Sequence, residues 1–323
     1  MDILIWTMGG HDIGMGHIFR QINLFHKLSK IYQVCFAIND DLETKELLKF
    51  NEIPYVVYNE FNDVLAYLKN NKPKLLVIDR LDTDSKEIVI IKKYIDTVIS
   101  FDDRGSGVSN VDVVINAIVP SLPETKKLLK GHEYMIFTKN VENRAKMKKL
   151  INDRIEKVLV TFGGSDPKEY TLKLEFLFSK YPSVQFFVVI GPNYQNKEKI
   201  KSFGQMYKNV QVLENCNDLS EYLYSADIAL ISGGITLFEA AYIGTPCIVL
   251  CQVEHQNITA KKFFDEGACE FINCAETELE EAVVKLFNKI KKQEVRLQMS
   301  NLQKKYVSVN GIENVLNVIK QLL

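Results

Sequence analysis

One stretch in the second half of the chain constrains the fold more than any other. The apolar run Ile228–Ile231 is short and continuous, which is typical of a strand buried on both faces. Ser232-Gly233-Gly234 ends this strand, and Ile235–Tyr242 has the pattern of a helix that follows at once. Gly244 and Pro246 then stop the helix, because glycine favours a left-handed cap and proline cannot continue the helix. A strand, a glycine turn and a helix in direct succession indicate an α/β fold.

The same succession of strand-like and helix-like segments runs through the rest of the chain. Alternation of this kind predicts a parallel sheet with helices on both faces, in which ligands bind at the carboxyl ends of the strands. In the first half we predict strands at Ile3–Met8, Gln33–Ile38, Tyr55–Tyr58, Lys74–Ile78, Thr97–Phe101 and Val113–Val119, and helices at His17–Ile31, Leu42–Phe50, Phe61–Leu68 and Lys86–Tyr94. In the second half we add strands at Val158–Phe162, Val184–Ile190, Val210–Glu214 and Cys247–Leu250, and helices at Leu172–Tyr181, Lys197–Tyr207, Leu219–Ser225, Leu279–Ile290 and Gly311–Leu323.

The alternation is interrupted once, by a polar and basic segment from Thr138 to Glu156. A chain of 323 residues is long for one domain, so we place the boundary here and predict domains at 1–150 and 151–323. The result is an α/β protein with two Rossmann-type, doubly wound domains, and we expect the ligand cleft to be interdomain.

Charge and composition exclude several classes of protein. The 40 basic and 41 acidic residues give a net charge of −1, which favours neither nucleic acid nor a charged membrane as a partner. No apolar run approaches the roughly 20 residues needed for membrane insertion, and Met1–Trp6 leads into a strand without the pattern of a signal peptide. The six cysteines include no C-x-x-C pair, so we expect reduced thiols, no metal site and a cytoplasmic location.

The glycine turn after Ile231 is a candidate anion site. Glycines between a strand and a helix let backbone N–H groups approach an anion, and the helix dipole favours negative charge there. We therefore assign Gly233 and Gly234 to a diphosphate, with Thr236 at the helix start, and we assign Glu239 to ribose hydroxyls. An ordinary tight turn between a strand and a helix explains the glycines about equally well.

The whole motif, Ser-Gly-Gly-Ile-Thr-x-x-Glu followed by Gly-Thr-Pro at 244–246, resembles the nucleotide-binding motif of the GT-B-fold UDP-sugar enzymes. That group includes the peptidoglycan-lipid N-acetylglucosaminyltransferase. The resemblance implies a GT-B-like fold in which the second domain holds most of the UDP. It also implies that the terminal helix, from Gly311, packs on the first domain.

A second glycine-rich loop, residues 9–17, follows the first strand. It is not a dinucleotide fingerprint, because the glycine spacing differs and no acid ends the next strand. Its glycines bring His17 to the start of a helix, where the helix dipole disfavours imidazolium and leaves a neutral base. From residue type alone, capping of the helix or phosphate binding is the commoner role for such a histidine.

Gly14-x-Gly16-His17-x-x-Arg20 before an apolar helix is similar to the signature of a hydrolase family from the pseudaminic acid pathway. That family cleaves UDP-2,4-diacetamido-2,4,6-trideoxy-β-L-altropyranose to UDP and the free sugar. The resemblance implies that His17 is the base that activates water, and that Gly16 and Arg20 lie near the sugar or the phosphate.

Two further loops of the first half match the same family. Asp79 ends a strand as the family's Val-Asp motif does, and Asp102-Asp103 matches its Asp-Asp pair. Carboxylates at strand ends can hold sugar hydroxyls or orient a base, whereas an Asp pair can also simply shape a turn. We favour one contact residue in the pair, Asp103, with Asn116 as a weaker candidate. Leu81 stands where the family usually carries a tyrosine.

Two loops of the second half complete the set of candidate contacts. Phe-Gly-Gly-Ser-Asp-Pro at 162–167 matches the hydrolase family, and we assign Gly164 and Ser165 to UDP. His255 and Gln256 follow the next strand, at a place where several UDP-sugar transferases have His-Gln, so both are candidates for the sugar or the phosphate. An exposed pair at a helix start is an equally good interpretation.

The sequence therefore predicts hydrolysis of a UDP-diacetamido-trideoxyhexose to UDP and free sugar, with His17 deprotonating the attacking water. Backbone amides at Gly233-Gly234 would stabilise the leaving UDP, so we expect no metal and no cofactor. A UDP-sugar glycosyltransferase of surface polysaccharide synthesis is the alternative, and a non-catalytic sugar-nucleotide-binding protein is a third. The expected ligand is a UDP-sugar, and enzymes of the same pathway are possible partners.

Overall fold

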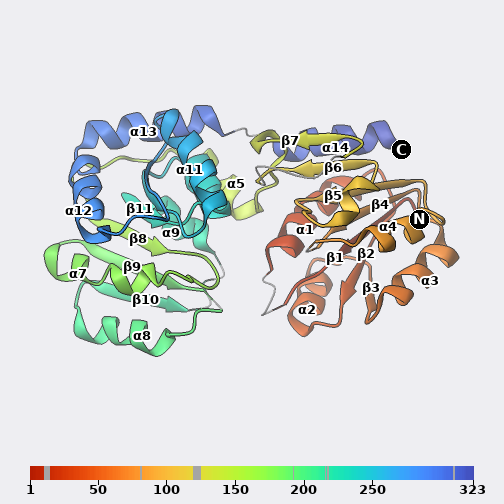
Figure 1. Ribbon diagram of the computed structural model, residues 1–323, viewed down its shortest axis with the longest axis horizontal. Coiled ribbons are helices and arrows are strands. Elements are labelled where there is room, and N and C mark those ends of the chain that lie inside the picture. The colour runs from red at the N-terminus through yellow and green to blue at the C-terminus, as the bar shows by residue number, and fades with distance from the viewer. Residues whose placement is uncertain are drawn as a thin grey trace. The chain divides into compact units, whose positions relative to one another are not determined.

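The computed structural model describes residues 1–10, 15–80, 82–118, 125–191, 193–214, 216, 218–307 and 310–323. The chain divides into two compact units (Figure 1). Unit 1 consists of Met1–Thr138 with Asn310–Leu323, and unit 2 consists of Lys139–Val309. Gly14 and Leu81, which entered the predictions, lie outside the described residues.

The strands described in unit 1 form one parallel sheet in the order β3-β2-β1-β4-β5-β6-β7. Each strand from β1 to β4 is followed by a helix, which is the succession that the sequence pattern predicts. The strands are β1 (Ile3–Thr7), β2 (Val34–Asn39), β3 (Tyr55–Tyr58), β4 (Leu75–Asp79), β5 (Thr97–Phe101), β6 (Val113–Asn116) and β7 (Leu128–Lys130). The helices are α1 (Gly16–Leu28), α2 (Leu42–Phe50), α3 (Phe61–Asn71), α4 (Ser85–Ile91), α14 (Gly311–Leu322) and the 3₁₀ turns η1 (Ser106–Ser109) and η2 (His132–Tyr134).

The two faces of the unit 1 sheet have separate cores, because successive side chains of a strand point to opposite faces. Ile5 of β1 packs with Ile18 of α1 and Ile319 of α14, whereas Trp6 packs on the other face with Ile88 of α4. The amphipathic helix α14 thus closes the first core, together with η2 and the loop around Met135. In Figure 1 this helix runs beside β7 within unit 1.

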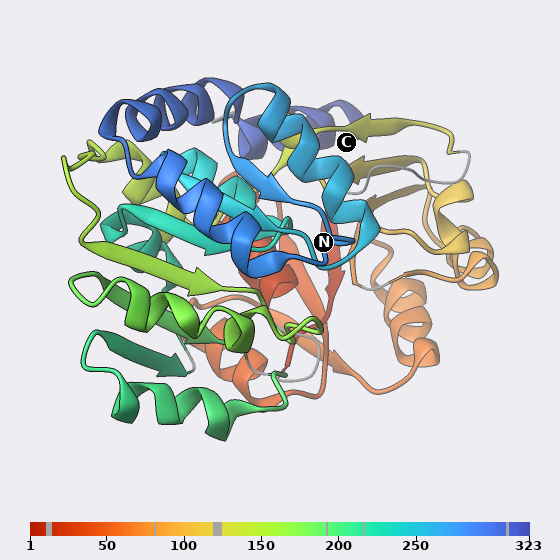
Figure 2. The same ribbon diagram turned by 60° about the vertical axis from the view of Figure 1, so that its left-hand side comes forward.

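The strands described in unit 2 form a second parallel sheet in the order β10-β9-β8-β11-β12-β13. Helix α8 lies along the edge strand β10, as Figures 1 and 2 show. The strands are β8 (Lys157–Thr161), β9 (Gln185–Ile190), β10 (Val210–Glu214), β11 (Ile228–Ile231), β12 (Cys247–Leu250) and β13 (Glu270–Ile272). The helices are α5 (Lys139–Lys146), α6 (Tyr170–Lys173), α7 (Phe176–Lys180), α8 (Lys197–Met206), α9 (Leu219–Ser225), α10 (Ile235–Ile243), α11 (Glu254–Asp265), α12 (Leu279–Ile290) and α13 (Gln293–Tyr306).

The segment that the sequence predicts to be a linker is bound to unit 2. Helix α5 packs on α10, and Lys149 donates from Nζ to the carbonyl oxygen of Ala226 at the end of α9, at 2.5 Å. Asp227 accepts from Nδ2 of Asn152 at 2.9 Å and from the backbone N–H of Glu156 at 2.8 Å. The chain therefore changes units after residue 138, and not near residue 150 as the sequence analysis placed it.

Several elements differ from the predicted ones. The predicted helix Leu172–Tyr181 is divided into α6 and α7, and it begins earlier because the Asp166 carboxylate accepts from the N–H groups of Tyr170 and Thr171. Helix α13 was not predicted, because the face that it buries is polar and includes Arg296 and Gln303. The same holds for α11, which buries Asn257 and Thr259.

Candidate functional site

Each sheet has the strand order of a doubly wound fold, in which the order reverses beside the first strand. The reversal lies between β1 and β4 in unit 1 and between β8 and β11 in unit 2. Ligands of such sheets bind at the carboxyl ends of the strands, near the reversal. Most of the candidate residues lie on loops that leave the two sheets at these ends.

In unit 1, His17 stands in the first turn of α1 and faces the end of β4. Its Nδ1 atom lies 2.7 Å from Oδ1 of Asp79, whose side chain is fully buried. Asp79 also accepts from Arg20, at 2.5 Å to Nη2 and 2.8 Å to Nε, and from Nε2 of Gln21 at 2.6 Å. Each carboxylate oxygen therefore has two donors, which leaves none of the usual acceptor sites for a sugar. The structure favours an orienting role for Asp79 over the predicted contact with substrate.

Opposite charges hold this cluster together. Burial alone would raise the pKa of Asp79, but the Arg20 guanidinium and the His17 hydrogen bond outweigh it and lower the pKa to about 2. Burial likewise opposes the charge of Arg20, and the carboxylates of Asp79 and Asp102 nevertheless raise the pKa of this guanidinium. Arg20 donates from Nη1 to Oδ2 of Asp102. Because two carboxylates already neutralise Arg20, the structure does not favour its predicted contact with phosphate.

The arrangement fixes which nitrogen of His17 can act as a base. An ionised carboxylate only accepts hydrogen bonds, so the proton of the neutral imidazole belongs on Nδ1, next to Asp79. The lone pair then lies on Nε2, and no described residue is hydrogen-bonded to that atom. The side chain is 23% exposed, so a reacting group can reach it.

The two neighbouring aspartates after β5 have different roles. Asp103 is buried and accepts from Thr83 at N (3.0 Å) and Oγ1 (2.5 Å) and from the N–H of Gly105 (2.8 Å). This network shapes the turn, which was the alternative interpretation of the pair. Asp102, with a left-handed φ of 44°, instead turns toward Arg20 and accepts from the N–H of Ala117 at 2.8 Å. The structure thus favours Asp102, and not the predicted Asp103, as the member that supports the candidate site.

The remaining candidates of unit 1 lie at the same ends of the strands. Gly16 is exposed, and a Cβ atom added to it would meet nothing within 4 Å. Asn116 is the last residue of β6 and is fully buried, so a ligand cannot reach its side chain without a local movement. Asn39, at the end of β2, holds Gly9 just after β1, since its amide accepts from the N–H of Gly9 (3.0 Å) and donates to the Gly9 carbonyl (2.8 Å).

In unit 2, three loops meet at the carboxyl ends of the adjacent strands β8, β11 and β12. After β8, Gly163, Gly164 and Ser165 are exposed, and a Cβ on either glycine would meet nothing within 4 Å. Gly163 needs its freedom for a left-handed φ of 80°, but Gly164 has no such requirement. The space beside the Cα of Gly164 is therefore open, while its carbonyl accepts from the N–H of Asn193 at 2.9 Å.

Of the two glycines after β11, Gly233 is required by close packing, whereas Gly234 has open space beside it. A Cβ on Gly233 would lie 2.9 Å from the Cβ of Gln256, so this glycine allows α11 to approach the loop. Its N–H donates to Oε1 of Gln256 at 3.4 Å. Gly234 is the N-cap of α10, and a Cβ there would meet only Oγ of Ser232, at 4.0 Å. The N–H of Leu237 donates to the carbonyl of Gly234 at 3.1 Å, whereas the N–H groups of Ile235 and Thr236 precede the first helical hydrogen bond and suit an anion.

Glu239 lies one turn into α10 and is half-buried. No described residue is hydrogen-bonded to its carboxyl group, and burial together with the nearby Asp218 raises the pKa of Glu239 to about 7. A half-buried carboxyl group without a partner suits a ligand with hydroxyl donors, as predicted for ribose. Thr236 lies in the first turn and is half-buried as well.

His255 and Gln256, which were predicted together as contacts, have different surroundings after β12. Gln256 is half-buried and bonded to the loops, whereas the side chain of His255 is exposed on the first turn of α11. For His255 the structure agrees with the exposed-pair interpretation. Gln252 joins the same loops, since it donates from Nε2 to the carbonyl of Phe162 at 2.8 Å.

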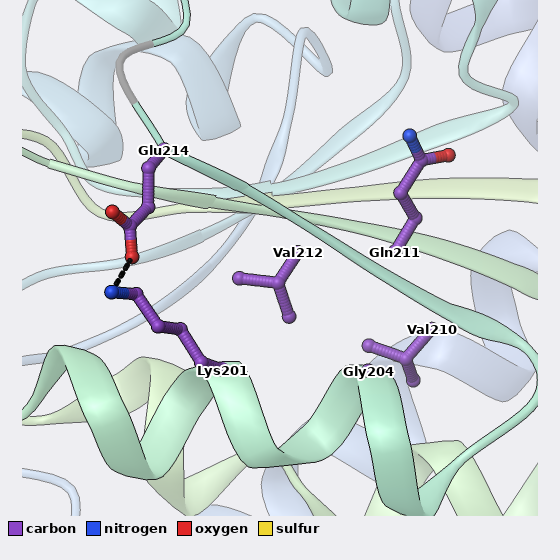
Figure 3. Close-up of a pocket in the computed structure, with 6 residues that line it drawn as sticks. All are labelled: Lys201, Gly204, Val210, Gln211, Val212 and Glu214. Carbon is purple, nitrogen blue, oxygen red and sulfur yellow. Dashed lines mark ion pairs between the residues drawn. The ribbon is translucent and has the colours of Figure 1, made fainter.

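Other features of the described residues do not belong to this site. A groove lies between α8 and β10, where Val212 points toward α8 between Lys201 and Gly204 (Figure 3). Lys201 forms an ion pair with Glu214 there at 2.9 Å. Within the described parts of the chain, no three His, Cys, Asp or Glu side chains are grouped as metal ligands. In the same parts, every helix is too short or too polar to cross a bilayer.

Residues 146–312 match the family described as the glycosyltransferase family 28 C-terminal domain, and this match spans more than half of the sequence. The chain belongs to this family. The matched region covers most of unit 2 and so includes its glycine loops after β8 and β11.

The chain is also similar to curated proteins and to solved structures. The spore coat polysaccharide biosynthesis protein SpsG of Bacillus subtilis is 28% identical, over 100% of this chain and 98% of its own. The uncharacterized protein MJ1062 of Methanocaldococcus jannaschii is 30% identical over 79% of this chain, which spans 57% of that relative's length. The crystal structure of Anabaena Alr3699/HepE in complex with UDP has a TM-score of 0.67 at 14% identity and covers 100% of both chains. The GT-B-like fold predicted from the sequence is confirmed.

Three residues of these networks were not among the predicted site residues. Gln21 was not predicted as a site residue, because it lies within a helix that the sequence indicated only by its apolar positions. Asp102 was named but passed over in favour of its neighbour. Gln252 carries a weak signal, since a glutamine directly after a buried strand lies at the ligand end of the sheet.

Proposed function

We propose that the protein is a UDP-sugar glycosyltransferase that acts in polysaccharide biosynthesis, with His17 as its catalytic base. The observation that carries the proposal is the 2.7 Å contact between His17 Nδ1 and the buried Asp79. Membership of the glycosyltransferase 28 family supports the reaction class, the name of SpsG supports the process, and the UDP complex of HepE supports the nucleotide.

In this reaction, Nε2 of His17 takes the proton of an acceptor hydroxyl. The acceptor oxygen bonds to the anomeric carbon, and the bond from that carbon to the diphosphate oxygen breaks. The electron pair of that bond leaves with UDP. Asp79 holds the ring by Nδ1 and stabilises the imidazolium that forms, and Arg20 and Gln21 hold Asp79 in turn.

Unit 2 contributes the binding of the leaving group. The open space beside Gly164 and the first N–H groups of α10 after Gly234 suit the oxygens of a diphosphate, whose charge increases as the bond breaks. Glu239 accepts from the ribose hydroxyls. Thr236 and Ser165 are further contacts on the same loops, as expected from the sequence.

Hydrolysis of a UDP-diacetamido-trideoxyhexose is the second candidate function. The observation in its favour is that the Gly16-His17-x-x-Arg20 motif and the acid at Asp79, which resemble the pseudaminic-pathway hydrolases, form one hydrogen-bonded cluster. The same base would then take its proton from water in place of an acceptor hydroxyl.

Measurement of UDP release separates these functions. The protein is incubated with UDP-N-acetylhexosamines and UDP-diacetamido sugars, each with and without a panel of sugar acceptors. UDP release that depends on an acceptor, with transfer of the sugar, supports the glycosyltransferase. Release at the same rate without an acceptor supports the hydrolase, and tight binding without any release contradicts both.

A further inference from the structure

One arginine at the carboxyl ends of the unit 1 strands takes no part in the cluster around His17. Arg80 directly follows Asp79, the last residue of β4, but its side chain lies on the other face of the sheet, over the ring of Trp6. Its Cζ atom is 4.3 Å from the centroid of that ring, a distance at which a guanidinium stacks favourably. The stacking fixes Arg80 at the end of the sheet where ligands of doubly wound folds bind.

The positive charge of Arg80 is poorly matched within the protein. Its Nε atom is buried and has no hydrogen-bond acceptor in the described part of the chain. Its ion pair with Glu87 of α4 is 3.9 Å long, which is too far for a hydrogen bond, and both side chains are partly exposed. Arg20, by comparison, donates directly to the carboxylates of Asp79 and Asp102. Of these two arginines, only Arg20 is neutralised by hydrogen-bonded carboxylates.

An unmatched guanidinium suits an oxyanion as its ligand. Buried donors in proteins nearly always have a partner, and a guanidinium can bind a carboxylate or a phosphate through two parallel hydrogen bonds. The side chain of Arg80 is 23% exposed, so such a group can reach it. In the proposed reaction the acceptor hydroxyl approaches His17, also at the carboxyl ends of the unit 1 strands, whereas the diphosphate is assigned to unit 2. The oxyanion that fits Arg80 is therefore one carried by the acceptor.

We propose that Arg80 binds a carboxylate or phosphate group of the sugar acceptor, and that it selects acidic acceptors over neutral ones. This inference deepens the proposed function and depends on it. Arg80 is a specificity residue here, because it binds a part of the acceptor that does not react. Glu87 competes with the acceptor for the same guanidinium, so substitutions of Arg80 and Glu87 should have opposite effects on the binding of acidic sugars.

The protein contains a reporter for this site, because its single tryptophan is Trp6. The emission of Trp6 is followed during titration with two matched pairs of sugars, namely glucose with glucuronic acid and N-acetylglucosamine with its 1-phosphate. We expect an acidic sugar to change the emission and to bind roughly tenfold to a hundredfold more tightly than its neutral partner, because it gains hydrogen bonds between charged groups. The pair that shows the preference distinguishes a carboxylate from a phosphate.

Three variants show whether the preference comes from Arg80. Arg80→Gln should abolish it, because a glutamine amide carries no charge. Glu87→Gln should increase the affinity for the acidic sugar by up to about fivefold, because the competing carboxylate is lost. The control Arg144→Gln removes an arginine that lies over the ring of Tyr224, at the end of α9 in unit 2, and should change neither affinity.

The results separate this inference from the proposed function. No preference in either pair, or a preference that persists in Arg80→Gln, would overturn the inference. If Arg80→Gln does not fold, Glu87→Gln decides, and an unchanged affinity for the acidic sugar in that variant would overturn the inference. UDP release is measured with the same sugars as acceptors. A preference for an acidic sugar that depends on Arg80, without UDP release that depends on this sugar, would instead overturn the proposed function.

Discussion

Units 1 and 2 have the same order of their central strands, yet the carboxyl ends of these strands carry opposite kinds of chemistry. In unit 1, ionisable side chains occupy this end and are bonded to one another, as His17, Arg20, Asp79 and Asp102 show. In unit 2, the corresponding loops carry Gly164 and Gly234, where an added Cβ would meet nothing closer than 4.0 Å.

Topology therefore determines where a ligand binds, whereas the residues at that place determine what is done to it. A rigid group of charged side chains can hold one nitrogen ready to take a proton. Bare glycine loops and helix amino termini can surround an anion without changing it.

Replacement of the base should have the largest effect. His17→Asn keeps a polar side chain of similar reach but cannot take up the proton, so the rate of UDP release should fall about 10²–10⁴-fold. UDP affinity, measured by calorimetry, should stay the same, because the proposed nucleotide site lies in unit 2. A loss of UDP affinity with a normal rate at saturation would show that His17 binds phosphate.

Removal of Asp79 from its cluster with His17 and Arg20 should lower the free energy of unfolding. The expected loss is similar in size to the rise in activation free energy expected for His17→Asn. Asp79→Ala leaves Arg20 largely buried without its main partner, which typically costs about 3–5 kcal/mol of the free energy of unfolding. Glu313→Gln, which breaks the exposed ion pair with Lys27, is the control and should cost less than about 1 kcal/mol. Urea denaturation measures both.

The same cluster predicts that the free energy of unfolding falls at acid pH. The pKa of Asp79 is lower in the folded protein than in the unfolded chain, so its contribution is complete above about pH 4 and is lost as the pH falls toward 2. In Asp79→Ala this part of the fall should be missing. An unchanged fall at acid pH would show that the carboxylate is not stabilised by its partners.

Glu239→Ala should weaken UDP binding by about 1.5–3 kcal/mol at pH 8, because the ribose hydroxyls lose a charged acceptor. The pKa of Glu239 is about 7, so wild-type affinity should increase between pH 6 and pH 8, and the mutant should lack this increase. Unfolding should show the opposite sign: a carboxyl group whose pKa is raised by folding loses stability as the pH rises from 4.5 to about 7. Calorimetry at both pH values that gives equal affinities for the two proteins would remove Glu239 from the site.

Alanine substitutions of glycines should have effects that depend on the place of the glycine in the fold. Gly164→Ala should fold normally and weaken UDP binding several-fold, because the new methyl group occupies the space where the ligand approaches. Gly191→Ala should reduce stability, because its Cβ would lie 2.1 Å from the carbonyl oxygen of Gly163. Gly16→Ala, in unit 1, should leave UDP affinity unchanged. If Gly16→Ala weakened UDP binding as much as Gly164→Ala does, the assignment of nucleotide binding to unit 2 alone would be wrong.

Chelation should have no effect at all. The described residues offer no cluster of metal ligands, and the amides of α10 suit the diphosphate. The rate of UDP release should therefore be the same with and without EDTA. Loss of the rate in EDTA and its return with Mg²⁺ would show that the leaving group needs a cation.

The sequence predicted most of the fold because strands buried on both faces and amphipathic helices leave clear periodic patterns. The patterns of Ile3–Met8 and Ile228–Ile231 correspond to β1 and β11 within a residue or so. Helix α13 escaped prediction because its buried face includes Arg296, Ser300 and Gln303, and polar side chains leave no apolar period. The same limit explains the boundary, since Lys149 and Asn152, polar residues of the supposed linker, are hydrogen-bonded to unit 2.

For the candidate site, the sequence indicated which loops matter but not how they are connected. It selected His17, Asp79 and the Asp102-Asp103 pair from their places after strands. It could not show that Asp79 uses all its acceptor sites within the protein, or that a left-handed backbone turns Asp102 toward Arg20. Those facts depend on contacts between residues about 60 to 80 positions apart, such as Arg20 with Asp79 and Asp102. Sequence patterns of short range do not contain that information.

Helix α14 has a consequence for how the protein is made. Its residues Val315, Leu316 and Ile319 complete the core beneath β1, yet the ribosome adds them after the whole of unit 2. Domains usually fold during synthesis in the order in which they emerge. Here the continuous unit 2 can fold while the first 138 residues still lack a helix of their core. The half that is synthesised first is therefore the half that is completed last.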